Sequence, residues 1–335
     1  MRSFWDPRQL SHSPSKELHN GAFVPYAEHI GRPKSILAAI GATEAAVDHG
    51  EEPLLRVHPR DYLDFLWSAH KDWRAAGREG DAAGYVWPVV GRRPLDLSRI
   101  DARLGRYSYD GGTPIAAGTF ESAYWSVQSA LSGLDAVIGG DPVAFALCRP
   151  PGHHAGADYM GGYCYLNSAA VAAEAAIAAG KSRIAILDID YHHGNGTQDI
   201  FYTRGDVLFV SIHADPKYDY PFYWGHADEE GAGDGEGANL NLPLPRGTAL
   251  AGFARALDTA LARIAAFGPD LLICCYGADT FTDDPISFFD LQTIDYPVIG
   301  RSIMSLGLPT LAVMEGGYAT DALGGNVAAF LEGLQ

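Results

Sequence analysis

Two carboxylates and two imidazoles stand close together in ILDIDYHHGNGTQ, residues 186–198, directly behind a run that is typical of a buried strand. An ionised carboxylate taken out of water costs several kcal/mol unless a partner compensates it. Along an extended chain Asp188, Asp190 and His192 project to the same side, so two of them can converge on one ion while the other supports them from behind. The sequence therefore predicts a metal site at this strand end.

The ligand types indicate which metal and which chemistry the site would use. Asp279, at the end of another apolar run, could supply a further oxygen. Two carboxylates and one imidazole without a thiolate form a fairly hard site that accepts Zn(II), Fe(II), Co(II) or Mn(II). Three protein ligands leave one position open, and a water there would be acidified from a pKa of ~16 toward ~7. The combination carries this prediction, because a single Asp or His is more often a helix cap or a core residue. His193 points to the opposite side of the chain, so we interpret it as an ordinary core or surface residue.

A second histidine pair lies in RPPGHHAG, residues 149–156, where two prolines and a glycine end a strand abruptly. Hydrolysis beside a metal needs one proton taken from water and one delivered to the leaving group, and imidazole has a suitable pKa for both. His153 and His154 are therefore candidate proton-transfer groups. Asp188 and Asn195 are the candidate partners that orient them.

The segments that position these residues alternate between short apolar runs and longer helical runs from about residue 143 onward. We predict strands at 143–147, 183–190, 207–214, 271–279 and 310–318, and helices at 167–179, 250–267 and 291–306. Apolar strands separated by helices indicate an α/β fold of three layers, a mostly parallel central sheet with helices on both faces. Ligands bind outside the carboxyl ends of such strands, and each polar cluster lies there. The last cluster, EGGY, ends in Tyr318, whose hydroxyl could stabilise a developing oxyanion.

The first 140 residues are less regular, with helices predicted at 34–48, 60–76 and 119–138. Residues 77–114 have weak periodicity and read as a long ordered loop or insertion, which is uncommon unless it serves binding or assembly. The Gly-rich residues 229–239 are predicted to form a surface loop. Because no repeat or linker divides the chain, we expect one catalytic domain over residues 1–335.

Composition limits the classes of partner. Lys and Arg number 24 against 41 Asp and Glu, which gives a formal net charge of −17. This balance argues against nucleic acid or an anionic membrane and suits a cationic partner. The four cysteines have no zinc or redox spacing, and no window approaches the ~20 apolar residues of a membrane span. Without a signal-like N-terminus, the expected location is a reducing cytoplasm.

Five motifs carry a family resemblance: RPPGHHAG, GGYCYLN, ILDIDYHHGNGTQDIFY, GADTFTDDPISFF and VMEGGY. They resemble those of the zinc-dependent histone deacetylase family, which has the arginase-deacetylase fold. The likeness is greatest to the bacterial acetylpolyamine amidohydrolases, whose KEL…GAFVP-like beginning is matched by residues 16–25. The resemblance runs over residues 15–335 and implies hydrolysis of the acetamide bond of small N-acetylated polyamines or diamines, releasing acetate and free amine. The alternative within the family is a protein lysine deacetylase or another short-acyl amide hydrolase.

The resemblance also implies roles for particular residues. The zinc ligands would be Asp190, His192 and Asp279. The proton-transfer pair would be His153 and His154, and Tyr318 would polarise the carbonyl. Asp188 would bind His153 and share a structural potassium ion with backbone oxygens and one hydroxyl, from Asp190, His192, Ser211 and Ile212. The walls of the substrate tunnel would include Gly162, Tyr163 and Tyr220.

One position departs from the pattern of many family members. They orient the second histidine with the Asp of HHGDG, whereas this chain has Asn195. An amide holds a proton on imidazole less strongly than a carboxylate, so the choice of base and acid within the histidine pair stays open. In residues 101–114, which in this subgroup line the entrance beside a partner subunit, Asp101 and Asp110 could bind a distal ammonium. The resemblance therefore also implies a homodimer.

Two other classes fit parts of the sequence. An Asp-x-Asp at a strand end also occurs in magnesium phosphotransferases that form an aspartyl phosphate, but these need neither a histidine pair nor the GGY tyrosine. A metal-binding or acetyl-amine-binding module without turnover would need the same residue types. Phosphate release would indicate the phosphotransferase, and metal binding without hydrolysis would indicate the binding module.

Overall fold

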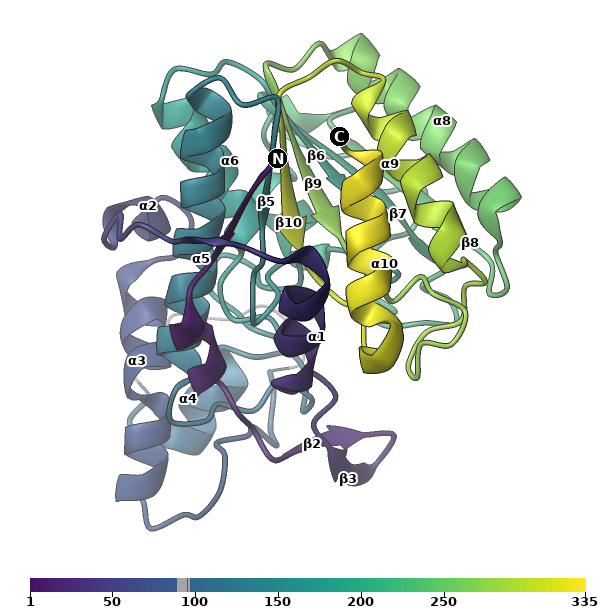
Figure 1. Cartoon of the computed structure of the whole chain (residues 1–335). Coiled ribbons are helices and arrows are strands. Elements are labelled where there is room, and N and C mark those ends of the chain that lie inside the picture. The colour runs from purple at the N-terminus through teal and green to yellow at the C-terminus, as the bar shows by residue number, and fades with distance from the viewer. Residues whose placement is uncertain (89–94, 96) are drawn as a thin grey trace.

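A parallel sheet of eight strands forms the centre of the computed structural model, which describes residues 1–88, 95 and 97–335 (Figure 1). The strand order is β4-β1-β5-β10-β9-β6-β7-β8, and each neighbouring pair is parallel. The strands are β1 (Arg2–Trp5), β4 (Glu44–Ala45), β5 (Val143–Ala146), β6 (Ile184–Asp188), β7 (Val207–Ala214), β8 (Asn239–Leu244), β9 (Leu271–Tyr276) and β10 (Thr310–Met314). The central strands β6, β9 and β10 are buried at every residue, as strands covered on both faces must be.

Helices cover both faces of this sheet (Figure 1). They are α1 (Gly31–Ile40), α2 (Glu52–Leu55), α3 (Arg60–Ala75), α4 (Ile100–Arg106), α5 (Thr119–Ile138), α6 (Ser168–Ala178), α7 (Asn195–Phe201), α8 (Leu250–Phe267), α9 (Tyr296–Met304) and α10 (Thr320–Gly333). In β6, Ile184 and Ile186 pack into the core that contains α5 and α6, while Ala185 and Leu187 pack into the core that contains α8 to α10. The alternation follows from the two-residue period of a strand, and it confirms the predicted three layers.

Most predicted elements are present, and the errors lie mainly near the N-terminus. The helix predicted at 34–48 ends at Ile40, because Gly41 has a φ of 79° and the chain then enters the edge strand β4. The sequence patterns missed the strands β1, β4 and β8, the helices α2, α7 and α10, and an antiparallel hairpin of β2 (Lys16–His19) and β3 (Ala22–Pro25). Most of these elements are short, β8 contains a proline and α10 contains glycines, so their periodicity is weak.

The predicted loop at 77–114 is only partly a loop. It contains α4, and its ends are fixed by single bridges between Ala82 and Ile115 and between Ser108 and Met160. Residues 89–94 and 96, which also belong to this prediction, lie outside the described residues. Residues 229–238 form the predicted loop around a short 3-10 turn at Gly233–Gly235, and the last predicted residue, Asn239, begins β8.

Two further features concern the chain as a whole. The four cysteines are free and buried. Among the described helices, none combines the length and the apolar character that crossing a membrane requires.

Candidate active site

The predicted metal ligands come from the ends of two neighbouring strands. Asp190 and His192 follow β6, and Asp279 follows β9, which is paired with β6 in parallel. Parallel strands end at the same edge of a sheet, so the three side chains meet although 87 residues separate His192 from Asp279. One ligand atom of each residue lies within 4.8 Å of those of the other two.

The two carboxylates of this group are completely buried. Asp190 accepts hydrogen bonds from the backbone N–H groups of His192 and Gly316, each at 2.8 Å. Asp279 accepts one from the backbone N–H of Tyr191 at 3.0 Å, and its Oδ2 lies 3.1 Å from Nδ1 of His192. Burial, together with the neighbouring Asp190, raises the pKa of Asp279 to about 7. Two buried carboxylates side by side are stabilised by positive charge or a proton between them, and the predicted divalent ion would supply that charge.

Two glycines let the backbone pass close to these carboxylates. A Cβ atom at Gly277 would lie 2.0 Å from Oδ2 of Asp190, and one at Gly316 would lie 2.4 Å from Oδ2 of Asp279. Among the residues that the structure describes, only imidazoles pair with these two carboxylates, and no Lys or Arg does so. A carboxylate, an imidazole and a second carboxylate suit a divalent metal such as zinc, so the residues fit the predicted ion.

The histidine pair lies beside this group, and each imidazole has its own partner. Nδ1 of His153 lies 3.0 Å from Oδ2 of Asp188, and Nδ1 of His154 lies 2.7 Å from Oδ1 of Asn195. Burial lowers the pKa of His153, but the carboxylates of Asp188 and Asp190 outweigh this effect and raise it to about 10. Burial and the neighbouring imidazoles of His153 and His192 hold the pKa of His154 well below its usual range. The environment thus separates two adjacent histidines in pKa.

A cavity of about 570 Å³ opens onto His154, His192 and Tyr318. The other residues predicted to form the tunnel also line it, namely Gly162, Tyr163 and Tyr220. The Tyr220 ring lies edge-on to His154 at 5.1 Å between centroids, and the Tyr163 ring lies edge-on to Tyr318 at 5.5 Å. The cavity therefore has aromatic walls that lead to the histidine and to the tyrosine hydroxyl.

Three carboxylates also line the cavity: Glu17, Asp110 and Asp219. Glu17 accepts a hydrogen bond from the Tyr163 hydroxyl at 3.0 Å, and burial raises its pKa to about 7. Asp219 is paired with Arg246 at 2.8 Å. Asp101, the other candidate acidic residue, pairs with Arg78 and Arg99 and is not among the residues that line this cavity.

The residues predicted to share a potassium ion lie on the next pair of strands. Asp188 ends β6 directly opposite Ser211 of β7, and Ile212 follows. The Ser211 hydroxyl lies 2.8 Å from Nδ1 of His213, and Oδ1 of Asp188 accepts a hydrogen bond from the Asp190 N–H at 3.1 Å. This pairing places the carboxylate and the hydroxyl side by side in the sheet.

Two buried carboxylates that sequence reasoning missed hold the catalytic loops by their backbones. Oε2 of Glu315 accepts hydrogen bonds from the N–H groups of Gly152 at 2.7 Å and His153 at 3.1 Å. Oδ2 of Asp284 accepts from the N–H groups of Tyr318 at 2.7 Å and Ala319 at 3.2 Å. Both residues stand inside the quoted motifs, as the Glu of VMEGGY and the second Asp of TDDP, so their position was the available signal.

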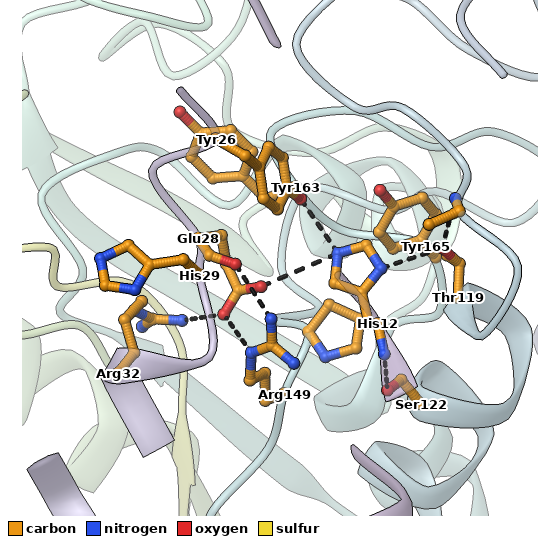
Figure 2. A network of polar contacts seen from close by, with 12 residues as sticks. His12, Tyr26, Glu28, His29, Arg32, Thr119, Ser122, Arg149, Tyr163 and Tyr165 are labelled. Carbon is orange, nitrogen blue, oxygen red and sulfur yellow. Dashed lines mark hydrogen bonds and ion pairs between the residues drawn. The ribbon is translucent and has the colours of Figure 1, made fainter. Parts of the chain in front are cut away.

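A third missed carboxylate, Glu28, connects these loops from behind (Figure 2). Its Oε1 accepts hydrogen bonds from Arg32 at 2.7 Å and from Arg149 at 2.9 Å. Arg32 also donates to the carbonyl oxygens of Glu315 and Gly317, which flank the turn before Tyr318. Arg149 directly precedes the turn that carries the histidine pair. One buried carboxylate thus holds two arginines that lead into both loops.

Comparison with known proteins agrees with this arrangement. The histone deacetylase domain matches residues 27–334. The chain is 48% identical over 98% of its length to acetylpolyamine amidohydrolase 2 of Pseudomonas aeruginosa, of which it covers 97%. It is 45% identical over its whole length to the acetylpolyamine amidohydrolase of Mycoplana ramosa, of which it covers 99%. The crystal structure of the Burkholderia pseudomallei acetylpolyamine aminohydrolase superimposes with a TM-score of 0.95 at 41% identity, covering 99% of this chain and 98% of that one.

Proposed function

Since the chain belongs to the histone deacetylase family, we propose that it hydrolyses the acetamide bond of small N-acetylated polyamines or diamines and releases acetate and the free amine. Relatives between 42% and 48% identical over nearly the full length bear the name acetylpolyamine amidohydrolase. The observation that carries the proposal is the meeting of a three-residue ligand group, a paired histidine and a tyrosine hydroxyl at one cavity.

Asp190, His192 and Asp279 would hold the metal, which we take to be zinc, with Fe(II) or Co(II) as substitutes. When bound, such an ion would polarise the substrate carbonyl and lower the pKa of water. Asp188, Ser211 and the backbone of Ile212 would hold the structural potassium ion. Metal content measured after Asp279→Ala should fall, and an unchanged content would contradict this ligand set.

His154 is proposed as the general base. Because Oδ1 of Asn195 can only accept, Nδ1 of His154 carries the proton, and Nε2 keeps its lone pair. The low pKa keeps this imidazole neutral, so Nε2 can take a proton from the attacking water. The imidazolium formed in this way then protonates the leaving amine. His153, held by Asp188, supplies positive charge behind it.

Tyr318 is proposed to donate its hydroxyl hydrogen bond to the carbonyl oxygen as negative charge develops there. Asp284 fixes its backbone, and the Arg32 guanidinium lies 5.0 Å from the centre of its ring. These contacts hold the phenol in place before the substrate arrives, which is the condition for efficient stabilisation.

The acidic lining is proposed to select a cationic substrate. Glu17 and Asp110 lack a Lys or Arg ion-pair partner among the described residues, whereas Asp219 has Arg246. A distal ammonium of a polyamine would supply the missing positive charge. We further propose that the whole chain acts as one catalytic domain and that it forms a homodimer, which sedimentation as a monomer would contradict.

The decisive experiment measures acetate release from acetylcadaverine, acetylputrescine, acetylspermidine and an acetyl-lysine peptide by the zinc-loaded protein. We expect the small polyamines to be hydrolysed with the highest kcat/KM. Faster hydrolysis of the peptide would keep the chemistry and overturn the substrate class. No hydrolysis of any acetamide would overturn the function.

A further inference from the structure

His154 is oriented by an amide, and an amide orients imidazole only when its oxygen faces the ring. A carboxylate accepts a hydrogen bond through either oxygen, whereas an amide has one accepting and one donating end. Asn195 is completely buried, and within the described part of the chain its Nδ2 has no hydrogen-bond partner. The amide nitrogen of Asn195 therefore does not determine which way round the amide group lies. Another group must hold Oδ1 toward His154.

Tyr109 is that group. Its hydroxyl lies 3.2 Å from Oδ1 of Asn195, as a second donor to the oxygen that accepts from His154 at 2.7 Å. The Tyr220 hydroxyl lies 2.5 Å from the Tyr109 oxygen and 2.8 Å from Oδ2 of Asp110, and it has a single proton for these two acceptors. When that proton is on the Tyr109 side, Tyr109 gives its own proton to Asn195. With the protons arranged in this way, rotating the amide by 180° would bring its NH2 group against the N–H of His154 and the O–H of Tyr109 and would lose both hydrogen bonds.

The position of Tyr109 is built into the fold. Its N–H donates to the Met160 carbonyl at 3.2 Å, which ties it to the segment that precedes the tunnel wall. A Cβ atom at Gly161 would lie 2.2 Å from Cε1 of Tyr109, so only glycine admits the ring there. The ring also lies edge-on to Trp224 at 5.5 Å between centroids. Tyr109 does not line the cavity, so it can influence the reaction only through its neighbours.

We propose that Tyr109 is a positioning residue that acts through Asn195 to hold His154 with its proton on Nδ1 and its Nε2 free to accept. This inference rests on the proposed role of His154 as the base. It explains how an amide can replace the carboxylate of HHGDG. A carboxylate accepts through either oxygen, whereas the amide of Asn195 needs the hydroxyl of Tyr109 to turn its oxygen, and not its nitrogen, toward His154.

The test begins with Tyr109→Phe, which removes only the hydroxyl. We expect kcat for acetylputrescine to fall by about tenfold, the kinetic equivalent of one neutral hydrogen bond, while KM stays within about twofold. Tyr107→Phe is the matched control. That residue lies two positions earlier, and its hydroxyl donates to Asp61 at 3.0 Å instead of to the site. Its kcat should stay at the wild-type value.

Two further backgrounds separate positioning from a general structural effect. In Asn195→Ala, adding Tyr109→Phe should cost nothing more, because the connecting amide is gone. In Asn195→Asp, the same change should cost less than about threefold, because a carboxylate accepts from His154 in either orientation. An equal tenfold loss in all three backgrounds, or a rise in KM at unchanged kcat, would overturn the proposal.

A measurement that does not depend on turnover can distinguish failure of the positioning role of Tyr109 from failure of the proposed function. In protein with isotope-labelled histidine, the Nδ1–H signal of His154, assigned by its absence from His154→Ala, should be protected from exchange in the wild type. It should broaden or shift in Tyr109→Phe and stay unchanged in Tyr107→Phe. An unchanged signal in Tyr109→Phe would overturn the positioning role even if no acetamide were hydrolysed.

Discussion

His153 and His154 are adjacent in the chain and differ in the groups that their Nδ1 atoms meet, a carboxylate for one and an amide for the other. The carboxylates of Asp188 and Asp190 favour the protonated form of His153. Burial and two neighbouring imidazoles disfavour it for His154. Groups of one chemical type thereby acquire different protonation states from their surroundings, which is how one site can supply both a base and a positive charge.

The Tyr318 hydroxyl gives the first prediction at this scale. Tyr318→Phe keeps the ring and removes the donor to the carbonyl oxygen, so kcat should fall by about 10²-fold or more. Zinc content should not change, because Tyr318 is not one of the ligand group. Tyr26→Phe is the control, since Tyr26 belongs to the same aromatic cluster but its hydroxyl lies 3.1 Å from Nε2 of His12 and it does not line the cavity. Near-normal kcat in Tyr318→Phe would contradict the proposed role.

The pKa of Glu17 gives a prediction about pH. Burial raises it to about 7, so the carboxyl is largely neutral below this pH and anionic above it. KM for acetylputrescine should therefore decrease as pH rises through about 7, because only the anion attracts the distal ammonium. The ratio of KM for acetylputrescine to KM for a neutral acetamide of similar length cancels the pH effects of groups that act on both substrates. This ratio should lose its pH dependence in Glu17→Gln, and a ratio that still changes would assign the effect to another group.

At the scale of elements, the site depends on loops held from behind by buried charges. Arg32 in α1 holds the carbonyl oxygens of Glu315 and Gly317 after β10, and Arg149 follows β5. Glu28 lies between the two guanidinium groups (Figure 2). The strands determine where the loops begin, and this network determines how they continue.

Glu28→Gln should therefore destabilise the protein strongly. The change leaves Arg32 and Arg149 buried without their shared counter-charge, and breaking such a buried pair costs about 3–5 kcal/mol. Urea unfolding followed by circular dichroism measures this loss. Glu44→Gln is the control, because Glu44 also pairs with an arginine, Arg2, but at the surface, where an ion pair contributes little. Similar unfolding midpoints for the two variants would contradict the proposed importance of the network.

For the molecule as a whole, the net charge of −17 and the acidic cavity lining act on a cationic substrate in the same direction. A field of this sign raises the local concentration of cations and is weakened by salt. The acidic composition thus has a consequence for the rate of substrate capture that no single residue carries.

We expect kcat/KM for acetylputrescine to fall severalfold when ionic strength rises from about 0.02 M to about 0.5 M, where the screening length shortens to about 4 Å. A neutral acetamide should show little change over the same range. Steady-state kinetics with both substrates would test this, and equal salt dependence would assign the effect to the protein's own stability or chemistry.

The sequence alone determined the layered α/β fold and the edge of the sheet at which the chemistry lies. Strands apolar along their whole length form a buried parallel sheet, and side chains directly behind such strands must meet at its carboxyl edge. This rule brings Asp279 to the same edge as Asp188, Asp190 and His192, whereas the choice of Asp190 and His192 over Asp188 as ligands came from the family resemblance. The residues nearest a strand end have little freedom of position, so local pattern is sufficient for them.

Tertiary structure decided the rest, because it depends on loops without periodicity. Glu28 reaches Arg149 across 121 residues, and Tyr109 reaches Asn195 across 86. Asp101 and Asp110 were equal candidates for binding a distal ammonium, and the tertiary structure pairs Asp101 with Arg78 and places Asp110 at the cavity. A sequence pattern reports which face of an element is apolar. It does not report where two irregular segments cross, and the contacts that hold and orient the reacting groups are made at such crossings.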